Sequence, residues 1–315
     1  MNLIDNAVII ELFGIRMYAF GAYVTAGVIF SIIVLNLAGK TLQLKKGTVP
    51  LAAFSAMVFG MLFSRISFCL LNQELGQLTP LSFWPHLDGG GWSMFGLIGG
   101  VLFGGWLSAG IAREKTGSVM DALCLSVLPM IVAERIGESR IEDFDISRPL
   151  DSAFLSGSFL ATGDDEPCLA TYYVTAALIL VLFIIFAVRF TRKERPGNLT
   201  IAFLILYGAV SIITESLRYD RFLSISFVGL QQIAAAVMLL AGVILAVRRS
   251  GGLKSAASVA AVICMPLMVC AVIGLEFALD RTTWNKIAIY VVMILTVSVP
   301  ALLGMKILKN TNEGM

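Results

Sequence analysis

Residues 118–140 read SVMDALCLSVLPMIVAERIGESR, an apolar stretch that ends in a cluster of charges. An α-helix needs about 20 mostly apolar residues to cross a bilayer. Glu134, Arg135 and Glu138 therefore stand where such a helix leaves the hydrocarbon, and helical spacing places the two glutamates on one face with the arginine beside them. An ionisable group inside a membrane is costly unless it is paired or hydrated, so this cluster is a candidate functional site.

The rest of the chain is equally apolar. Its 315 residues are 58% hydrophobic and 14% charged, with a mean hydropathy of +0.88, which excludes a soluble globular domain. Because backbone polar groups in lipid must hydrogen-bond internally, the long apolar segments are expected to be helices. The predicted fold is an all-α, polytopic transmembrane helical bundle of about nine spans. They cover 17–38, 49–72, 92–112, 118–135, 169–190, 199–217, 226–247, 256–277 and 286–306.

Basic residues gather on alternate loops. The segments after the first, third, fifth, seventh and ninth spans hold every lysine except Lys286, whereas 73–91 has no basic residue. Because Lys and Arg concentrate on the cytoplasmic side, we expect the N-terminus outside and the C-terminus in the cytoplasm. The early acidic residues Asp5 and Glu11 argue against a cleaved signal peptide. The long connection 136–168 then faces outside.

Further ionisable residues interrupt other spans toward the same predicted face. Arg65 lies deep in the second span, and Glu215 and Arg218 end the sixth. A guanidinium is a planar fork that matches phosphate oxygens, which a lysine does not reproduce. Together with Arg135, these residues predict an electropositive pocket for a lipid head-group phosphate. Local ion pairs at helix ends, including a structural pair of Arg65 with Glu138 or Glu215, are the alternative interpretation.

Glycines mark two segments of the chain. Gly96, Gly100 and Gly104 recur at every fourth position of the third span, a spacing that lets two membrane helices approach closely. We therefore expect this stripe to pack against a neighbouring helix. The segment 88–91 (DGGG) precedes the same span from outside, where backbone N–H groups could face an anion.

Other site classes and domain divisions have little support in the sequence. The five cysteines and single histidine lack metal-ligand spacing, so we expect no metal and no other cofactor. No feature indicates nucleic-acid binding, and no internal repeat of the transporter kind is visible. The segment 250–254 (SGGLK) is the weakest seam. We therefore expect a main transmembrane domain over 1–250 and an appended two-helix transmembrane segment over 251–315.

Several motifs, taken in order, resemble those of prolipoprotein diacylglyceryl transferase, a bacterial inner-membrane enzyme family. The similarity covers roughly residues 10–247, so it leaves the eighth and ninth spans outside. No single motif is strong, but their order, spacing and common sidedness carry the resemblance. The matching segments are 14–18 (GIRMY), the arginine at 65, 88–96 (DGGGWSMFG), 135–138 (RIGE), 207–218 (YGAVSIITESLR) and the glutamine at 232.

The resemblance implies a reaction and its residues. The family transfers a diacylglyceryl group from phosphatidylglycerol to the lipobox cysteine of a preprolipoprotein, which forms a thioether and releases glycerol phosphate. A base near the outer surface would take the thiol proton, and arginines would stabilise the departing phosphate. The protein would be a multi-pass protein of the bacterial cytoplasmic membrane, with its site facing the outer leaflet. The implied residues are Arg135, Glu138 and Glu215 for catalysis, and Tyr18, Arg65, Asp88, Gly89, Gly90, Arg218 and Gln232 for substrate binding.

The chain departs from the family at three key positions. Phe95 stands in place of a histidine, Ser211 in place of an arginine and Glu138 in place of an asparagine. Because a phenylalanine cannot accept a proton, the base would have to be Glu138, Glu215 or Asp88. Two other functions stay open: a catalytically inactive relative that binds phospholipid or a membrane partner, and a transporter of small anions.

Overall fold

The computed structural model describes residues 8–12, 15–71, 92–141, 146–147, 158–162, 168–192, 194–219, 224–225 and 228–313. Within these ranges, nine α-helices are long and apolar enough to cross a membrane, which confirms the predicted all-helical transmembrane fold. The helices are α1 (Ala19–Thr41), α2 (Thr48–Leu71), α3 (Met94–Ala112), α4 (Thr116–Gly137), α5 (Thr171–Thr191), α6 (Asn198–Leu217), α7 (Leu230–Arg249), α8 (Ala256–Arg281) and α9 (Lys286–Glu313).

Three short antiparallel strand pairs and one 3-10 turn accompany the helices. The pairs are β1 (Val8–Leu12) with β2 (Ile15–Tyr18), β3 (Ala161–Thr162) with β4 (Cys168–Leu169), and β5 (Ser224–Ile225) with β6 (Val228–Gly229). The turn η3 (Glu138–Arg140) continues the end of α4. These pieces lie at helix ends, where backbone groups no longer find partners inside a helix.

The chain divides into two compact units. Unit 1 comprises Met1–Val188 and Leu217–Asp220 and holds α1 to α4 with most of α5. Unit 2 comprises Arg189–Ser216 and Arg221–Met315 and holds α6 to α9. The division of the sequence into a main domain over 1–250 and an appended segment over 251–315 stays a prediction.

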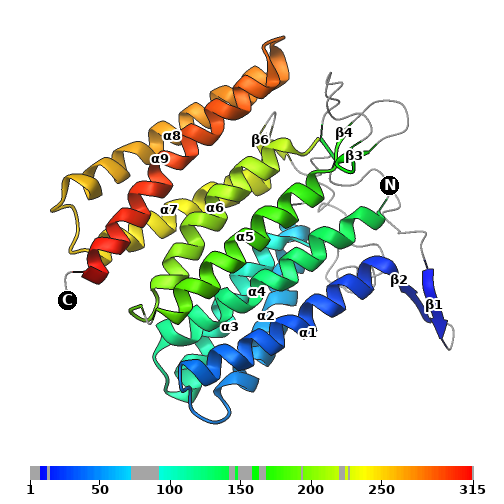
Figure 1. Cartoon of the computed structure of the whole chain (residues 1–315), viewed down its shortest axis with the longest axis vertical. Helices are drawn as coiled ribbons and strands as arrows, with labels where there is room; N and C mark the ends of the chain where they lie inside the picture. Colours follow the sequence, from blue (N-terminus) through cyan, green and yellow to red (C-terminus); the bar gives the residue numbers. More distant parts are fainter. Residues whose placement is uncertain are drawn as a thin grey trace. The chain divides into compact units, whose positions relative to one another are not determined.

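In unit 1, α2 lies along α3 and α1 lies along α4 (Figure 1). The glycine stripe of α3 faces α2, because a Cβ added to Gly100 would lie 2.0 Å from the carbonyl oxygen of Phe59. A Cβ on Gly104 would lie 2.7 Å from the carbonyl oxygen of Ser55. Only glycine allows backbones this close. The predicted packing role of the stripe is therefore confirmed.

The core of unit 1 is built around α4. Most of its residues between Ser118 and Pro129 are buried, and Ile131 is completely so. The hydroxyl of Ser126 donates to the carbonyl oxygen of Leu123 at 3.0 Å, so this polar side chain is satisfied inside its own helix. Burial of α4 on most sides fixes the position of the charged residues at its end.

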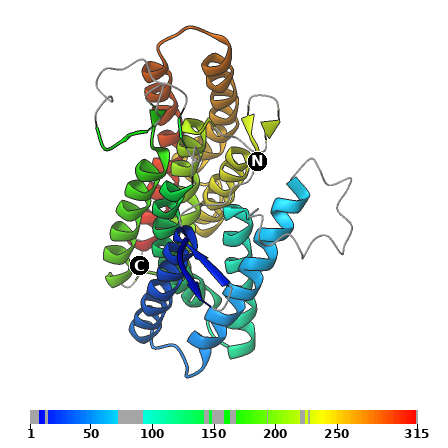
Figure 2. The same cartoon turned by 90° about the vertical axis from the view of Figure 1, so that its right-hand side faces the viewer.

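Unit 2 is closed by the hairpin of α8 and α9, which run side by side and also contact α7 (Figure 2). The helices α6 and α7 approach closely, since a Cβ on Gly208 would lie 2.9 Å from the carbonyl oxygen of Ala235. In α9, a Cβ on Gly304 would lie 2.9 Å from Cδ1 of Ile205 on α6. Within unit 2, the last two helices thus pack directly on the helices that precede them.

Candidate functional site

Arg135 and Glu138 form a buried ion pair where α4 passes into η3. The two residues are 5% and 3% exposed, and Nη1 of Arg135 donates to both carboxylate oxygens of Glu138 at 2.9 Å. Glu134 is a second acidic neighbour, with its Oε2 3.4 Å from Nε of Arg135. The two glutamates thus lie beside this arginine, as the helical spacing predicted.

The two carboxylates beside Arg135 bear on the prediction of an electropositive pocket at this end of α4. One guanidinium between two ionised carboxylates has no net positive charge, so Arg135 does not by itself create the predicted electropositive pocket. A phosphate that bound Arg135 through Nη1 would compete with Glu138. Removing one partner of a buried pair costs about 3–5 kcal/mol. The catalytic roles of Arg135 and Glu138 stay predictions.

Arg65 lies near the end of α2 and is only 5% exposed. Its guanidinium carbon lies 5.8 Å from the ring centroid of Phe68 and 5.9 Å from that of Trp92. Such cation–π contacts stabilise a cation in a site with little water. The neighbouring Ser64 hydroxyl donates to the carbonyl oxygen of Ser93 at 2.8 Å and accepts from its N–H at 2.9 Å. The end of α2 therefore fixes the start of α3.

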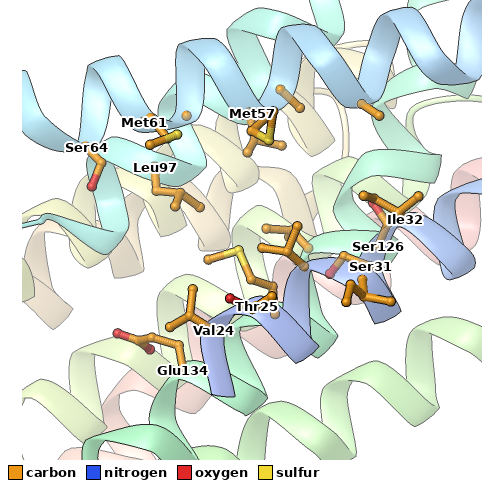
Figure 3. A pocket seen from close by; sticks show the side chains of 18 of the residues that line it. Val24, Thr25, Ser31, Ile32, Met57, Met61, Ser64, Leu97, Ser126 and Glu134 are labelled. Carbon is orange, nitrogen blue, oxygen red and sulfur yellow. The ribbon is translucent and has the colours of Figure 1, made fainter. Parts of the chain in front are cut away.

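A cavity of about 620 Å³ lies inside unit 1, between α1, α2, α3 and α4 (Figure 3). Its wall on α1 extends from Phe20 to Leu35. At 1.5 Å per residue this is a length of about 22 Å. Ile29 on α1 and Met57 and Met61 on α2 line the cavity and are more than half exposed. The cavity therefore opens sideways between α1 and α2.

The cavity wall is almost entirely apolar. Its hydroxyl groups are largely satisfied by the backbone, as in Thr25, which donates to the carbonyl oxygen of Gly21 at 2.7 Å. Among the described residues of the wall, Glu134 is the single charged one. Figure 3 shows Glu134 and Ser64 at one end of the cavity and Ser31 and Ile32 at the other. The cavity thus combines a long apolar wall with one carboxylate.

Three other predicted site residues lie at helix ends. Tyr18 is half-buried and directly precedes α1. Arg218 is 7% exposed, belongs to unit 1 and forms a backbone bridge with Ser147. Glu215 is half-buried in α6 of unit 2. The predicted residues Asp88, Gly89 and Gly90 lie outside the part of the chain that the structure describes.

Gln232 pairs with a residue to which the sequence analysis gave no role. It is 2% exposed on α7, and its Nε2 donates to Oε1 of Glu276 on α8 at 2.8 Å. The same nitrogen lies 3.3 Å from the carbonyl oxygen of Ile212. Glu276 is completely buried. The signal that could have found it is a lone carboxylate inside an otherwise apolar span.

Comparisons with known proteins agree with the resemblance of the motifs. The sequence model of the family described as prolipoprotein diacylglyceryl transferase matches residues 7–248. A phosphatidylglycerol–prolipoprotein diacylglyceryl transferase of Clostridium tetani is 22% identical over 245 residues, which cover 75% of this chain and 94% of the relative. An enzyme of the same name from Finegoldia magna is 23% identical over 252 residues, or 77% and 95% of the two chains.

Proposed function

Because the chain belongs to the prolipoprotein diacylglyceryl transferase family, we propose that it transfers a diacylglyceryl group from phosphatidylglycerol to the lipobox cysteine of a prolipoprotein. The reaction takes place at the bacterial cytoplasmic membrane, in the outer leaflet. The observation that carries this proposal is the apolar cavity of unit 1, which opens sideways between α1 and α2. An acyl chain can enter such an opening from the bilayer without crossing a polar layer.

The dimensions of the cavity suit a lipid chain. Its volume of about 620 Å³ lies within the range of small-molecule sites, roughly 300–1,000 Å³. Its wall along α1 covers most of the hydrocarbon thickness of a bilayer, which is about 30 Å. Three of its hydroxyl groups, those of Thr25, Ser64 and Ser126, donate to backbone carbonyl oxygens, so the wall presents mainly carbon to an occupant, and this favours an apolar ligand over a polar one.

The position of two arginines supports a phosphate near the charged end of the cavity. Arg65 directly follows the wall residue Ser64, and Arg135 directly follows the wall residue Glu134. In the proposed reaction both guanidinium groups stabilise the phosphate as it leaves with the electron pair of the broken C–O bond. Tyr18, at the start of α1, hydrogen-bonds the head group. Glu215, Arg218 and Gln232 keep their predicted roles as site residues.

A blocking substitution tests the proposal. The protein is reconstituted in nanodiscs that contain phosphatidylglycerol, and mass spectrometry follows the thioether formed on a lipobox peptide. Val24→Trp fills the cavity and is expected to lower transfer by about tenfold or more, equivalent to at least 1.4 kcal/mol. Leu37→Trp is the control, because Leu37 lies on the same helix, is 58% exposed and does not line the cavity. Equal loss in both variants, or loss in neither, would contradict the proposed role of the cavity.

A second candidate function is lipid binding without transfer. The Arg135–Glu138 pair favours it, because the guanidinium already has a carboxylate partner. Phe95, where the family has a histidine, also favours it. In this case a photoactivatable phospholipid would label unit 1, and Val24→Trp would prevent labelling, while no thioether would form. An anion transporter has less support, since the single charged residue of the described cavity wall is a carboxylate.

A further inference from the structure

The three acidic groups considered as the base for this reaction are not part of the described cavity wall. Glu138 is 3% exposed, is not part of the cavity wall and places both carboxylate oxygens on Nη1 of Arg135. Glu215 is half-buried on α6 and does not line the cavity. Asp88 lies outside the described residues. A carboxylate that borders the cavity is therefore a further candidate for the base.

Glu134 is the carboxylate that the cavity wall contains. It lines the end of the cavity that also holds Ser64 (Figure 3). Its Oε2 lies 3.4 Å from Nε of Arg135, so a fixed cation on the same helix holds it in place. Its side chain is 17% exposed, compared with 4% for that of Glu138. A group from outside the protein can thus reach Glu134 more easily than Glu138.

The residue at position 95 does not supply this chemistry. Phe95 lies in the first turn of α3, between Met94 and Leu97, which both line the cavity, while Phe95 itself is not part of the described wall. A phenyl ring has no acceptor for a proton. Among the side chains of the described wall, a carboxylate is the one group that can take a proton from a thiol.

On the basis of the proposed function, we propose that Glu134 is the general base that accepts the proton of the lipobox thiol. The S–H bond breaks and its proton passes to the Glu134 carboxylate. The thiolate sulfur attacks the terminal glycerol carbon of the diacylglyceryl group, and a C–S bond forms as the C–O bond to phosphate breaks. The electron pair leaves with the phosphate oxygen as glycerol phosphate. The proton then passes from Glu134 to water or to the released phosphate.

Removing the carboxylate without changing its shape gives the first measurement. Glu134→Gln is expected to lower the rate of thioether formation by about 100-fold or more, while photolabelling by phospholipid stays within twofold of the wild type. Glu114→Gln is the matched control. Glu114 is half-buried in the same unit and does not line the cavity, and its Oε1 accepts from the backbone N–H of Lys45 at 2.7 Å. Wild-type rates in Glu134→Gln would overturn the assignment.

Rescue by an added carboxylate separates a chemical role from a structural one. Formate is expected to raise the transfer rate of Glu134→Ala by about tenfold and to leave the rate of Glu114→Ala unchanged. No rescue of a folded Glu134→Ala protein would overturn the assignment. If Glu134→Ala does not fold, Glu134→Asp is expected to retain about a tenth of the activity, and an inactive but folded Glu134→Asp would also overturn it. A wild-type protein without any product would overturn the proposed function together with this role.

Discussion

The charged residues at the end of α4 owe their properties to their immediate neighbours. The sequence predicts Arg135 as a phosphate ligand. In the structure its Nη1 donates to Glu138 at 2.9 Å and its Nε lies 3.4 Å from Glu134. The two carboxylates differ in turn, because Glu138 is buried on the arginine and Glu134 borders a cavity. Four positions along the chain thus separate a carboxylate that is buried against Arg135 from one that borders the cavity.

Breaking the buried pair is expected to destabilise the protein strongly. Glu138→Gln removes the carboxylate that accepts from Nη1 of Arg135 and leaves Glu134 as the other acidic neighbour, and both side chains of the pair are almost completely buried. The expected loss in free energy of unfolding is about 3–5 kcal/mol, which thermal unfolding in detergent would measure. The double variant Arg135→Met/Glu138→Met removes both charges and should recover part of this loss. A Glu138→Gln protein as stable as the wild type would show that the pair contributes little.

At the scale of elements, the helices of each unit are joined by close backbone contacts and by a few polar contacts. The α2–α3 contact depends on the absence of side chains at every fourth position of α3. The α7–α8 contact includes the hydrogen bond from Gln232 to Glu276, and Tyr290 on α9 donates to the carbonyl oxygen of Ser216 on α6 at 3.2 Å. Both kinds of contact form only when the two neighbouring helices are aligned so that the contacting residues lie at the same height.

Two adjacent glycines of α3 should respond differently to the same change. Gly100→Ala places a Cβ 2.0 Å from a backbone oxygen of α2 and is expected to cost about 1–3 kcal/mol. Gly99→Ala meets nothing within 4 Å and should be neutral or stabilise the helix by up to about 1 kcal/mol. Unfolding midpoints of the two variants in one detergent provide the comparison. Equal effects would contradict the contact between these helices.

A double-mutant cycle measures how strongly α8 is tied to α7. Gln232→Leu removes the donor to a completely buried carboxylate and is expected to cost about 1–3 kcal/mol. Gln232→Leu combined with Glu276→Leu should cost less than the sum of the single changes, with a coupling of about 0.5–3 kcal/mol. Gln231→Leu, one position earlier and only half-buried, is the control. Additive effects would mean that the two side chains do not interact in the membrane.

For the molecule as a whole, the nine spans of the described residues and the distribution of basic residues predict a topology in the membrane. Leu253 lies in the connection before α8 and Trp284 in the connection after it, and both are well exposed, at 59% and 68%. A single membrane span separates them. The two residues are therefore expected on opposite sides of the membrane, and the side on which each one lies reports the orientation of the chain.

Cysteine labelling in intact cells tests this orientation. In a variant without native cysteines, Trp284→Cys is expected to react with a membrane-impermeant maleimide, because the positive-inside rule places this connection outside. Leu253→Cys should react only after the membrane is permeabilised. The reverse pattern would place the Glu134 end of the cavity toward the cytoplasm and would contradict a site that faces the outer leaflet.

The features that depend on local composition could be predicted from the sequence. Hydropathy over about 20 residues predicted the nine spans found among the described residues, because each helix meets the requirement of crossing the bilayer alone. The glycine spacing of α3 predicted close packing, and ordered motifs predicted the family that matches residues 7–248. Helical spacing also predicted that Arg135 lies beside both Glu134 and Glu138.

The groups that meet across helices could not be predicted from the sequence, because they depend on how the helices pack. The cavity between α1 and α2 exists because α1 packs on α4 and α2 packs on α3, an arrangement that no single segment encodes. The same arrangement placed Glu134 on the cavity wall and Glu276 beside Gln232. Hydrophobicity fixes how far a helix extends in the bilayer, but in lipid it does not select the neighbours of that helix. Shape and hydrogen bonding between distant side chains make that choice.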